Sequence, residues 1–101
     1  MVVIVFRSRL REGIALEELA RMGGRMYELA SAMPGFVSYK DFTAEDGENV
    51  SIVEFESLET LEAWRTHPEH RAVQEQGRAA LMTEYHIQVC QTVRDYAFRA
   101  S

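Results

Sequence analysis

Two hydrophobic periods alternate along the chain and predict its strands and helices. Residues 1–10 begin with a β-branched and aromatic run and continue with alternating apolar and polar side chains, which is typical of a strand. From residue 15 to residue 33 apolar positions recur at steps of three and four, and this spacing predicts a helix. Pro34 and Gly35 end that helix, because proline disfavours a helical residue before it and glycine accepts unusual dihedral angles.

Gly23 and Gly24 interrupt the helical pattern. Each costs a helix interior roughly 1 kcal/mol relative to alanine. Either tertiary packing overrides this weak point, or the bare backbone lets a ligand or a strand approach closely. The sequence leaves both interpretations open.

Residues 36–43 and 49–56 are predicted to form a hairpin across the turn at residues 44–48, where Asp46-Gly47 is a strong turn signal. Strict alternation places Phe36, Ser38, Lys40 and Phe42 on one face of the first strand and Val37, Tyr39, Asp41 and Thr43 on the other. Large apolar side chains therefore occupy both faces of the hairpin. A sheet with one solvated face would not need them.

A kinked helical unit is predicted over residues 58–81, with Ser57 as its N-cap and a bend near His67. Thr66 and Glu69 have the spacing of a capping box, and Pro68 fits the first turn of a new helix. Residues 85–93 alternate again and predict the last strand, with the odd-numbered side chains on one face and His86, Gln88 and Cys90 on the other.

The resulting order, β-α-β-β-α-β, defines an α+β, ferredoxin-like fold with an antiparallel sheet. We expect one domain over residues 1–95 and a tail over residues 96–101, whose Tyr96 and Phe98 are expected to dock. Two helices on one face of the sheet leave the other face bare. We therefore expect a homodimer whose sheets meet face to face and enclose a barrel-like interior.

Composition narrows the partners. The chain has 101 residues with 11 Lys+Arg against 16 Asp+Glu, a net charge of −5, which argues against nucleic acid. No run of about 18 apolar residues predicts a membrane span, and the first residues do not form a signal peptide. Cys90 is the only cysteine, which excludes an internal disulfide. We expect a cytoplasmic location.

Four segments carry a family resemblance. The segment WRTHPEHRAVQEQGR at residues 64–78 resembles the antibiotic biosynthesis monooxygenase family of dimeric α+β barrels. MPGFVSYKDF before the hairpin turn, VSIVEFES after it and the closing YHIQVCQTV are similar as well, so the resemblance spans about residues 2–93. It implies the dimeric barrel and is specific for the family rather than for one reaction, because relatives include quinol and anthrone oxygenases, heme-degrading enzymes and signal-processing proteins.

Neither metal nor cofactor is expected. No phosphate-binding glycine loop or dinucleotide fingerprint is present. His67 and His70 are three residues apart, but two imidazoles make a poor metal site, and local hydrogen bonding is the alternative. The heme-degrading relatives resemble one another in an axial histidine and a first-strand asparagine, and the corresponding positions here are Gln74 and Arg7. A heme enzyme is therefore the disfavoured alternative.

The resemblance implies oxygenation without a cofactor, on an aromatic, quinol-like or polyketide-like small molecule. Such a reaction needs an apolar pocket, a proton acceptor and a donor that stabilises an anion. Trp64, Phe55, Tyr39, Met22, Met26 and Tyr27 are the candidates for substrate binding, and His67, His70, Tyr85 and His86 are the candidates for catalysis, with Arg78 as a further donor. Trp64 fits a packed core equally well, and a methionine stripe is more often core packing than a ligand wall. The rival hypothesis is a dimer that binds a small hydrophobic ligand, as a stress-associated protein would, and catalyses nothing; an effector-binding domain is a further rival.

Overall fold

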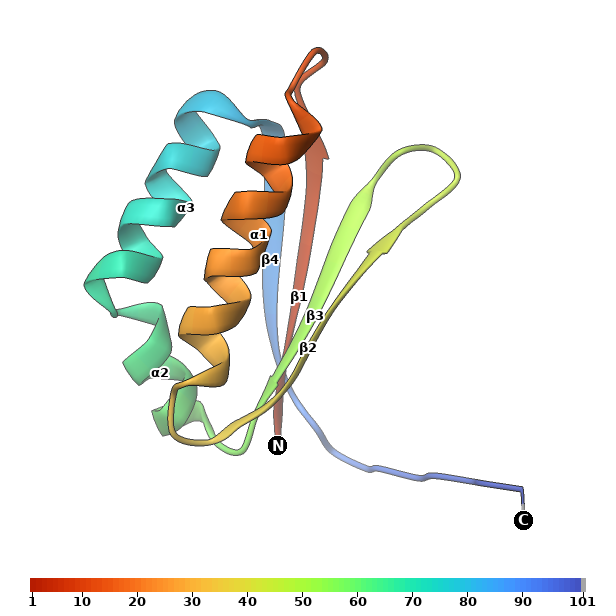
Figure 1. Cartoon of the computed structure of the whole chain (residues 1–101). Coiled ribbons are helices and arrows are strands. Elements are labelled where there is room, and N and C mark those ends of the chain that lie inside the picture. Colours follow the sequence, from red (N-terminus) through yellow and green to blue (C-terminus); the bar gives the residue numbers. More distant parts are fainter. Residues whose placement is uncertain (101) are drawn as a thin grey trace.

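A computed structural model describes residues 1–100 as one sheet with helices on one side (Figure 1). The elements are β1 (Val2–Leu10), α1 (Leu16–Ser31), β2 (Phe36–Thr43), β3 (Asn49–Phe55), α2 (Leu58–Arg65), α3 (Pro68–Ala80) and β4 (Met82–Gln91). The sheet is antiparallel with strand order β2-β3-β1-β4. This arrangement confirms the predicted ferredoxin-like α+β fold.

The helical unit breaks where the sequence predicts a bend, although the cap differs from the prediction. Ser57 caps α2 through its side chain, as expected. The capping residue of α3 is His67, whose Nδ1 accepts a hydrogen bond from the Glu69 backbone N–H at 3.1 Å. Thr66 instead ends α2 and donates its hydroxyl to the Glu62 carbonyl at 2.8 Å. The expected Thr66–Glu69 capping box is therefore wrong, because Thr66 belongs to the end of the preceding helix.

A register shift in β2 changes which side chains share a face. Phe36 pairs with Phe55, whereas Ser38 pairs with the adjacent residue Glu54, so Val37 is the extra residue of a bulge. Phe36 and Tyr39 consequently both pack against the core on the helix side. The predicted strict alternation, with Phe36 and Tyr39 on opposite faces, is wrong at this point.

The last strand starts earlier and ends earlier than the predicted 85–93, because it pairs with β1 from Leu10↔Met82 to Val2↔Gln91. The chain then runs away from the domain as an extended tail (Figure 1). Tyr96 and Phe98 are 83% and 92% exposed. The expectation that they dock is wrong for this single chain, since neither packs against its own domain.

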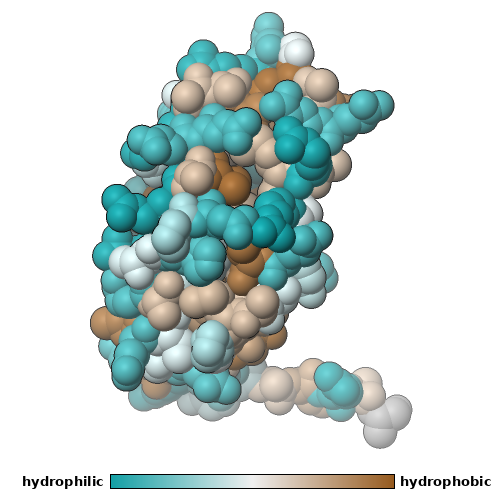
Figure 2. Space-filling model, turned by 60° about the vertical axis from the view of Figure 1, so that its left-hand side comes forward, coloured by the Kyte–Doolittle hydropathy of each residue, from teal (hydrophilic) through white to brown (hydrophobic). Residues whose placement is uncertain are grey.

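The core lies between the sheet and the helices. It includes Phe55 and Leu61, the largest fully buried side chains, beside Trp64 and Ala30. Viewed from the helix side, the surface is largely hydrophilic, with hydrophobic residues visible in its recesses (Figure 2). Gly35, between α1 and β2, has φ +82°, and its backbone packs so closely on Thr60 that an added Cβ would lie 2.6 Å from that side chain.

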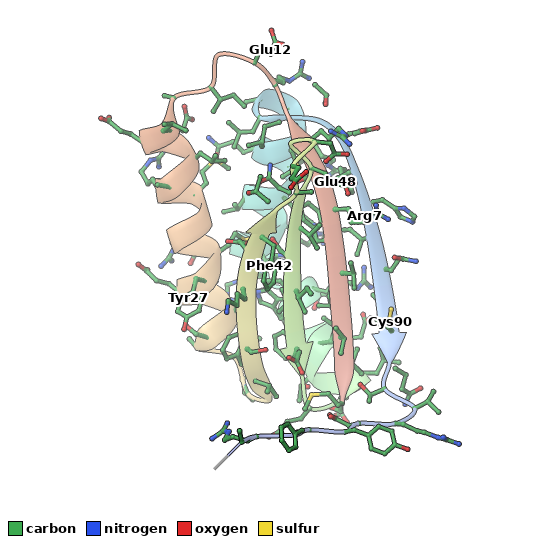
Figure 3. All side chains as sticks on the ribbon, turned by 90° about the vertical axis from the view of Figure 1, so that its right-hand side faces the viewer. Arg7, Glu12, Tyr27, Phe42, Glu48 and Cys90 are labelled. Atoms are coloured by element: carbon green, nitrogen blue, oxygen red, sulfur yellow. The ribbon has the colours of Figure 1, made fainter. Side chains whose placement is uncertain are left out.

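The other face of the sheet carries no helix (Figure 3). Val3, Val5, Val50 and Ile52 are half-buried there, and Phe42 is 47% exposed. The same face holds Arg7, which forms an ion pair with Glu48 at 3.0 Å, and the free Cys90.

Candidate active site in the cavity between helices and sheet

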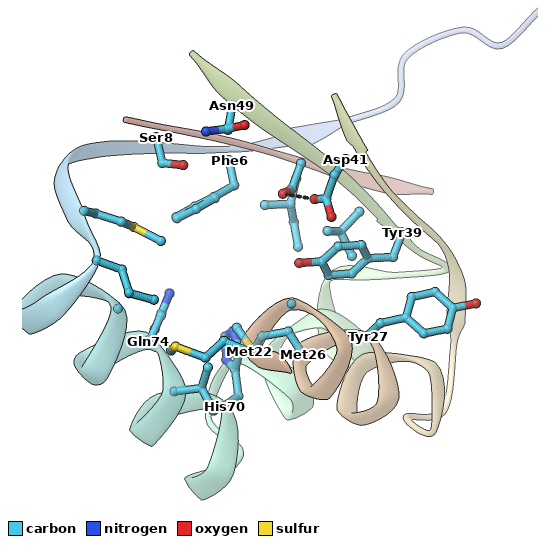
Figure 4. A pocket seen from close by; sticks show the side chains of 18 of the residues that line it. Phe6, Ser8, Met22, Met26, Tyr27, Tyr39, Asp41, Asn49, His70 and Gln74 are labelled. Carbon is cyan, nitrogen blue, oxygen red and sulfur yellow. Dashed lines mark hydrogen bonds between the residues drawn. The ribbon is translucent and has the colours of Figure 1, made fainter. Parts of the chain in front are cut away.

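A cavity of about 790 Å³ separates the helices from the sheet (Figure 4). Its walls come from α1, from the α2–α3 unit and from the helix-facing side chains of all four strands. Such a volume is within the range of small-molecule sites. Most of the lining is apolar, and its polar side chains include Ser8, Tyr39, Asp41, Asn49, Ser51, His70 and Gln74.

An aromatic stack forms the helix-side wall. The rings of Phe55 and Trp64 are stacked with centroids 5.5 Å apart, and Trp64 in turn stacks on His70 at 4.0 Å. The break between α2 and α3 makes this possible, because it brings residues from two helices against each other. Trp64 and His70 are only 6% and 4% exposed, yet both contribute to the cavity lining.

The indole N–H of Trp64 has no hydrogen-bond partner within residues 1–100. A buried donor without a partner costs about 1–3 kcal/mol. Folded proteins satisfy nearly all such groups, so each exception calls for a reason. Trp64 lines the cavity, but its indole nitrogen is itself buried, so an acceptor on a bound molecule would satisfy the donor once the side chains over that nitrogen move aside.

Burial lowers the pKa of His70 below its ordinary value, since the charged imidazolium is poorly solvated there. The nearby imidazole of His67 and guanidinium of Arg65 lower it further, although hydrogen bonding to the backbone opposes them. The Nδ1 atom of His70 lies 3.4 Å from the Arg65 carbonyl oxygen. With Nδ1–H donating to that carbonyl, Nε2 keeps its lone pair and can accept a proton.

The sheet side of the cavity has a different character. Burial, together with the negative charge of Asp41, raises the pKa of Tyr39, so its hydroxyl stays protonated. Ser51, directly opposite Asp41 in the register, donates its hydroxyl to the Asp41 carboxylate. Tyr39 and Asp41 point into the cavity from β2 (Figure 4), and Ser51 lines it from β3.

The structure brings together six of the predicted site residues on the cavity lining, namely Trp64, Tyr39, Met22, Met26, Tyr27 and His70. Phe55 lies behind Trp64 and supports it. His67 is occupied as a helix cap, which is the local role considered as the alternative. We leave it out of the candidate site.

Tyr85 and His86 also fall outside the cavity lining. Tyr85 stacks on Phe6 at 5.7 Å, and its hydroxyl lies 3.4 Å from Arg78 at a separate, small surface depression. His86 pairs with Arg7 in the register and shares the bare face of the sheet with it. The alternation along β4 indicated two faces but could not say which of them looked inward.

Several cavity residues were not among the predicted ones. Asp41 and Ser51 are two of them, and the register that pairs them across β2 and β3 is what brings them together. Gly23 and Gly24 also line the cavity, and a Cβ added to either would meet no atom within 4 Å. The helix α1 runs unbroken through both glycines, as the packing interpretation predicts, and close approach by a ligand stays a prediction.

Among the described residues, no group of three or more His, Cys, Asp or Glu side chains is arranged to hold a metal ion. Gln74 does line the cavity, where the heme-degrading relatives are expected to present an axial histidine. Arg7 faces the opposite side of the sheet, and its neighbours Phe6 and Ser8 are the cavity-facing residues. The donor set therefore gives heme iron no histidine ligand at the expected position.

In the part of the chain described, no helix is long and apolar enough to cross a membrane.

These features define a small ferredoxin-like α+β protein with a ligand-sized cavity between its helices and its sheet. Residues 1–76 match the family model described as "Antibiotic biosynthesis monooxygenase". The chain belongs to that family, which confirms the resemblance carried by the four segments.

Individual relatives agree with this assignment. The chain is 31% identical over 75 residues to the uncharacterized protein YqjZ of Bacillus subtilis; the match covers 74% of this chain and 66% of YqjZ, just under two thirds of that protein. Among solved structures, Rv0793 from Mycobacterium tuberculosis superposes with a TM-score of 0.81 at 22% identity, covering 95% of this chain and 98% of that one. A variant of SnoaB, a cofactor-independent oxygenase from Streptomyces nogalater, gives 0.79 at 17% identity, covering 93% and 94%. At these identities the two structures support the fold.

Proposed function

We propose that the protein is a cofactor-independent oxygenase for an aromatic, quinol-like or polyketide-like small molecule, that it acts as a homodimer, and that it works in the cytoplasm. The single observation that carries the proposal is the stacked Trp64–His70 pair on the wall of an apolar cavity. It supplies an unsatisfied donor and a neutral imidazole side by side. Similarity to SnoaB supports the cofactor-independent route.

In the proposed reaction, His70 accepts a proton from an acidic O–H or C–H of the bound substrate. The resulting anion is electron-rich, and the Trp64 N–H stabilises it by hydrogen bonding. The anion gives one electron to molecular oxygen, and the superoxide and substrate radical combine with formation of a C–O bond. The peroxide takes up the proton from His70, and cleavage of its O–O bond with loss of water, which carries away the second substrate hydrogen, leaves a carbonyl.

The cavity walls have a second role in this reaction. Met22 and Met26 are flexible apolar side chains that suit a flat aromatic molecule. An apolar enclosure also excludes water from the substrate anion and its radical. The protonated Tyr39 offers a further donor on the opposite wall.

The proposed homodimer uses the bare face of the sheet. That face presents half-buried valines and Ile52 together with Phe42 at 47% exposure. An isologous contact between two such faces would cover these apolar side chains. Tyr96 and Phe98 of the tail, which do not pack on their own domain, are available to the partner copy.

The test compares two histidines that are close in sequence and differ in position. Oxygen uptake is measured with the purified protein and a panel of anthrones and naphthohydroquinones. We expect His70→Gln to lower the enzyme-dependent rate by roughly 10²- to 10⁴-fold, because it removes the proton acceptor. His67→Asn is the matched control, since asparagine is a good helix N-cap and His67 lies outside the cavity.

Two results would contradict the proposal. Oxygen uptake equal to that of the protein-free buffer for every compound would favour the non-catalytic ligand-binding dimer. Equal losses in both histidine variants would show that His70 acts through helix stability rather than chemistry. Absorbance spectra recorded after heme addition test the heme alternative, which predicts a shifted Soret band.

A further inference from the structure

The register of the sheet sorts the helix-facing side chains by polarity. At one end of β3, Phe55 faces Val2 and Phe36, and the next row holds Val53, Ile4 and Tyr39. Toward the hairpin the rows become polar, first Ser51 with Asp41 and Phe6, and then Asn49 with Ser8 and Thr43. Along β2 and β3 the sheet wall of the cavity therefore changes from apolar beside Phe55 to polar beside Asn49, whereas other parts of the lining stay apolar, among them Leu10, Leu16, Leu19 and Met82.

The Trp64–His70 pair belongs to the apolar end, because Trp64 stacks on Phe55. Ser51 is four residues from Phe55, which corresponds to about 13 Å along a strand. A ligand that reached both ends would be an elongated, flat molecule such as a fused-ring aromatic. One edge would lie against Trp64 and His70, and the other would meet Asp41.

Within residues 1–100, Asp41 carries the only carboxylate on the cavity wall. It has no salt-bridge partner among residues 1–100, and its hydrogen bond comes from Ser51. An ionised carboxylate is purely an acceptor with two oxygens, so one Ser51 hydroxyl does not exhaust its capacity. Asp41 can therefore accept a donor from a bound molecule.

We propose that Asp41, oriented by Ser51, is a specificity-determining residue that receives a hydroxyl group at the end of the substrate remote from Trp64 and His70. This inference rests on the proposed function for the identity of the reacting end. A hydroxyl fits better than an ammonium group, because it can donate to Asp41 and also accept from the protonated Tyr39 on the same wall.

The chemical consequence is a fixed orientation. A negative charge beside the remote hydroxyl disfavours its ionisation, whereas the Trp64 N–H favours an anion at the other edge. The substrate therefore loses the proton of the group near His70 and keeps the proton of the hydroxyl near Asp41. Oxygen is then added at the end of the molecule that lies against the aromatic stack.

Binding under nitrogen tests this site separately from the reaction. The probes are 2,6-dihydroxynaphthalene and 6-methoxy-2-naphthol, which share the ring system and differ in one donor. Isothermal titration calorimetry should give the wild type roughly five- to tenfold higher affinity for the dihydroxy probe. Asp41→Asn should reduce this ratio to about two, and Ser51→Ala should give an intermediate ratio. Glu45→Gln, at an exposed hairpin carboxylate outside the cavity, is the charge-matched control.

An equal affinity for the two probes in the wild type, no binding of either at millimolar concentration, or an unchanged ratio in folded Asp41→Asn would overturn the inference. Circular dichroism establishes folding of each variant. Oxygen uptake measured in parallel distinguishes the two proposals. Normal turnover with no discrimination refutes only the role of Asp41, whereas discrimination without turnover refutes only the oxygenase.

Discussion

Replacing Trp64 with phenylalanine separates the role of its N–H from the role of its ring. The substitution keeps an aromatic ring between Phe55 and His70 but deletes the buried donor that has no partner in the described chain. An ordinary core tryptophan would lose stability through this change. A tryptophan that keeps a donor for a ligand should lose activity instead.

The magnitude follows from two opposing effects. The smaller ring leaves roughly 40 Å³ unfilled, which costs about 1 kcal/mol at about 24 cal/mol per Å³, with a few tenths more for lost hydrophobic transfer. Removing the unsatisfied donor returns about 1–3 kcal/mol. The free energy of unfolding should therefore lie between about 0.5 kcal/mol below and about 2 kcal/mol above the wild-type value. The oxygenation rate should fall by about 10²- to 10³-fold, as expected for loss of a donor to a developing anion.

Urea unfolding followed by far-UV circular dichroism measures the first quantity, at one fixed protein concentration because a dimer's stability depends on it. Fluorescence does not serve, since Trp64 is the only tryptophan. Leu61→Ala, at a core residue that is 2% exposed, provides the contrast and should cost about 2–5 kcal/mol. A loss of 3 kcal/mol or more in Trp64→Phe, or an unchanged oxygenation rate, would refute the reasoning.

Three further predictions concern pH, the glycine pair and the tail. The pKa of His70 is lowered in the folded protein, so the unfolded chain takes up the proton more readily. The stability that comes from keeping this imidazole neutral is complete above about pH 6.5 and is lost as pH falls below it. The free energy of unfolding should therefore decline less steeply toward low pH in His70→Gln, and an identical slope in the two proteins would contradict the buried imidazole. Gly23→Ala should raise the free energy of unfolding by about 0.5–1 kcal/mol, because its Cβ meets no atom within 4 Å. Gly23→Leu should instead narrow the cavity and weaken naphthol binding severalfold in calorimetry. Undiminished binding by Gly23→Leu would show that the glycine does not lie beside the ligand. Sedimentation velocity at micromolar concentration should give twice the chain mass of 11.6 kDa, and removal of residues 94–101 should shift the equilibrium toward monomer; a full-length monomer would rule out the proposed dimer.

The hydrophobic periods were sufficient for the order and type of the elements. They failed where local geometry adds or reassigns a residue. The bulge at Val37 leaves no apolar or turn signal, because it is a property of the pairing between β2 and β3. His67 replaced Thr66 as the cap because the Thr66 hydroxyl donates to the Glu62 carbonyl at the end of α2, whereas the His67 Nδ1 accepts from the Glu69 N–H.

The candidate site was only half predictable for a related reason. Trp64 and the methionines follow from residue type and helical spacing, and Tyr39 follows from residue type in a strand, because large apolar side chains at such positions either fill a core or line a cavity. The inward direction of His70 and the outward direction of His86 depend on the α2–α3 break and on the β1–β4 register. Both are three-dimensional facts, so three histidines of equal standing in sequence became one cavity residue, one helix cap and one residue on the bare face.

The bulge in β2 decides which side chains of this strand face the helices. In an unbroken strand, Phe36 and Asp41 would project from opposite faces, because five residues separate them and side chains alternate with a period of two. The extra residue Val37 restores the phase, so Phe36 packs against Phe55 in the core while Asp41 pairs with Ser51 at the cavity mouth, both on the helix side. Tyr39 and Asp41 line the cavity and share a face in any case, because they are two residues apart. The bulge adds Phe36 to that face, so one short strand contributes both to the core beside Phe55 and to the cavity wall.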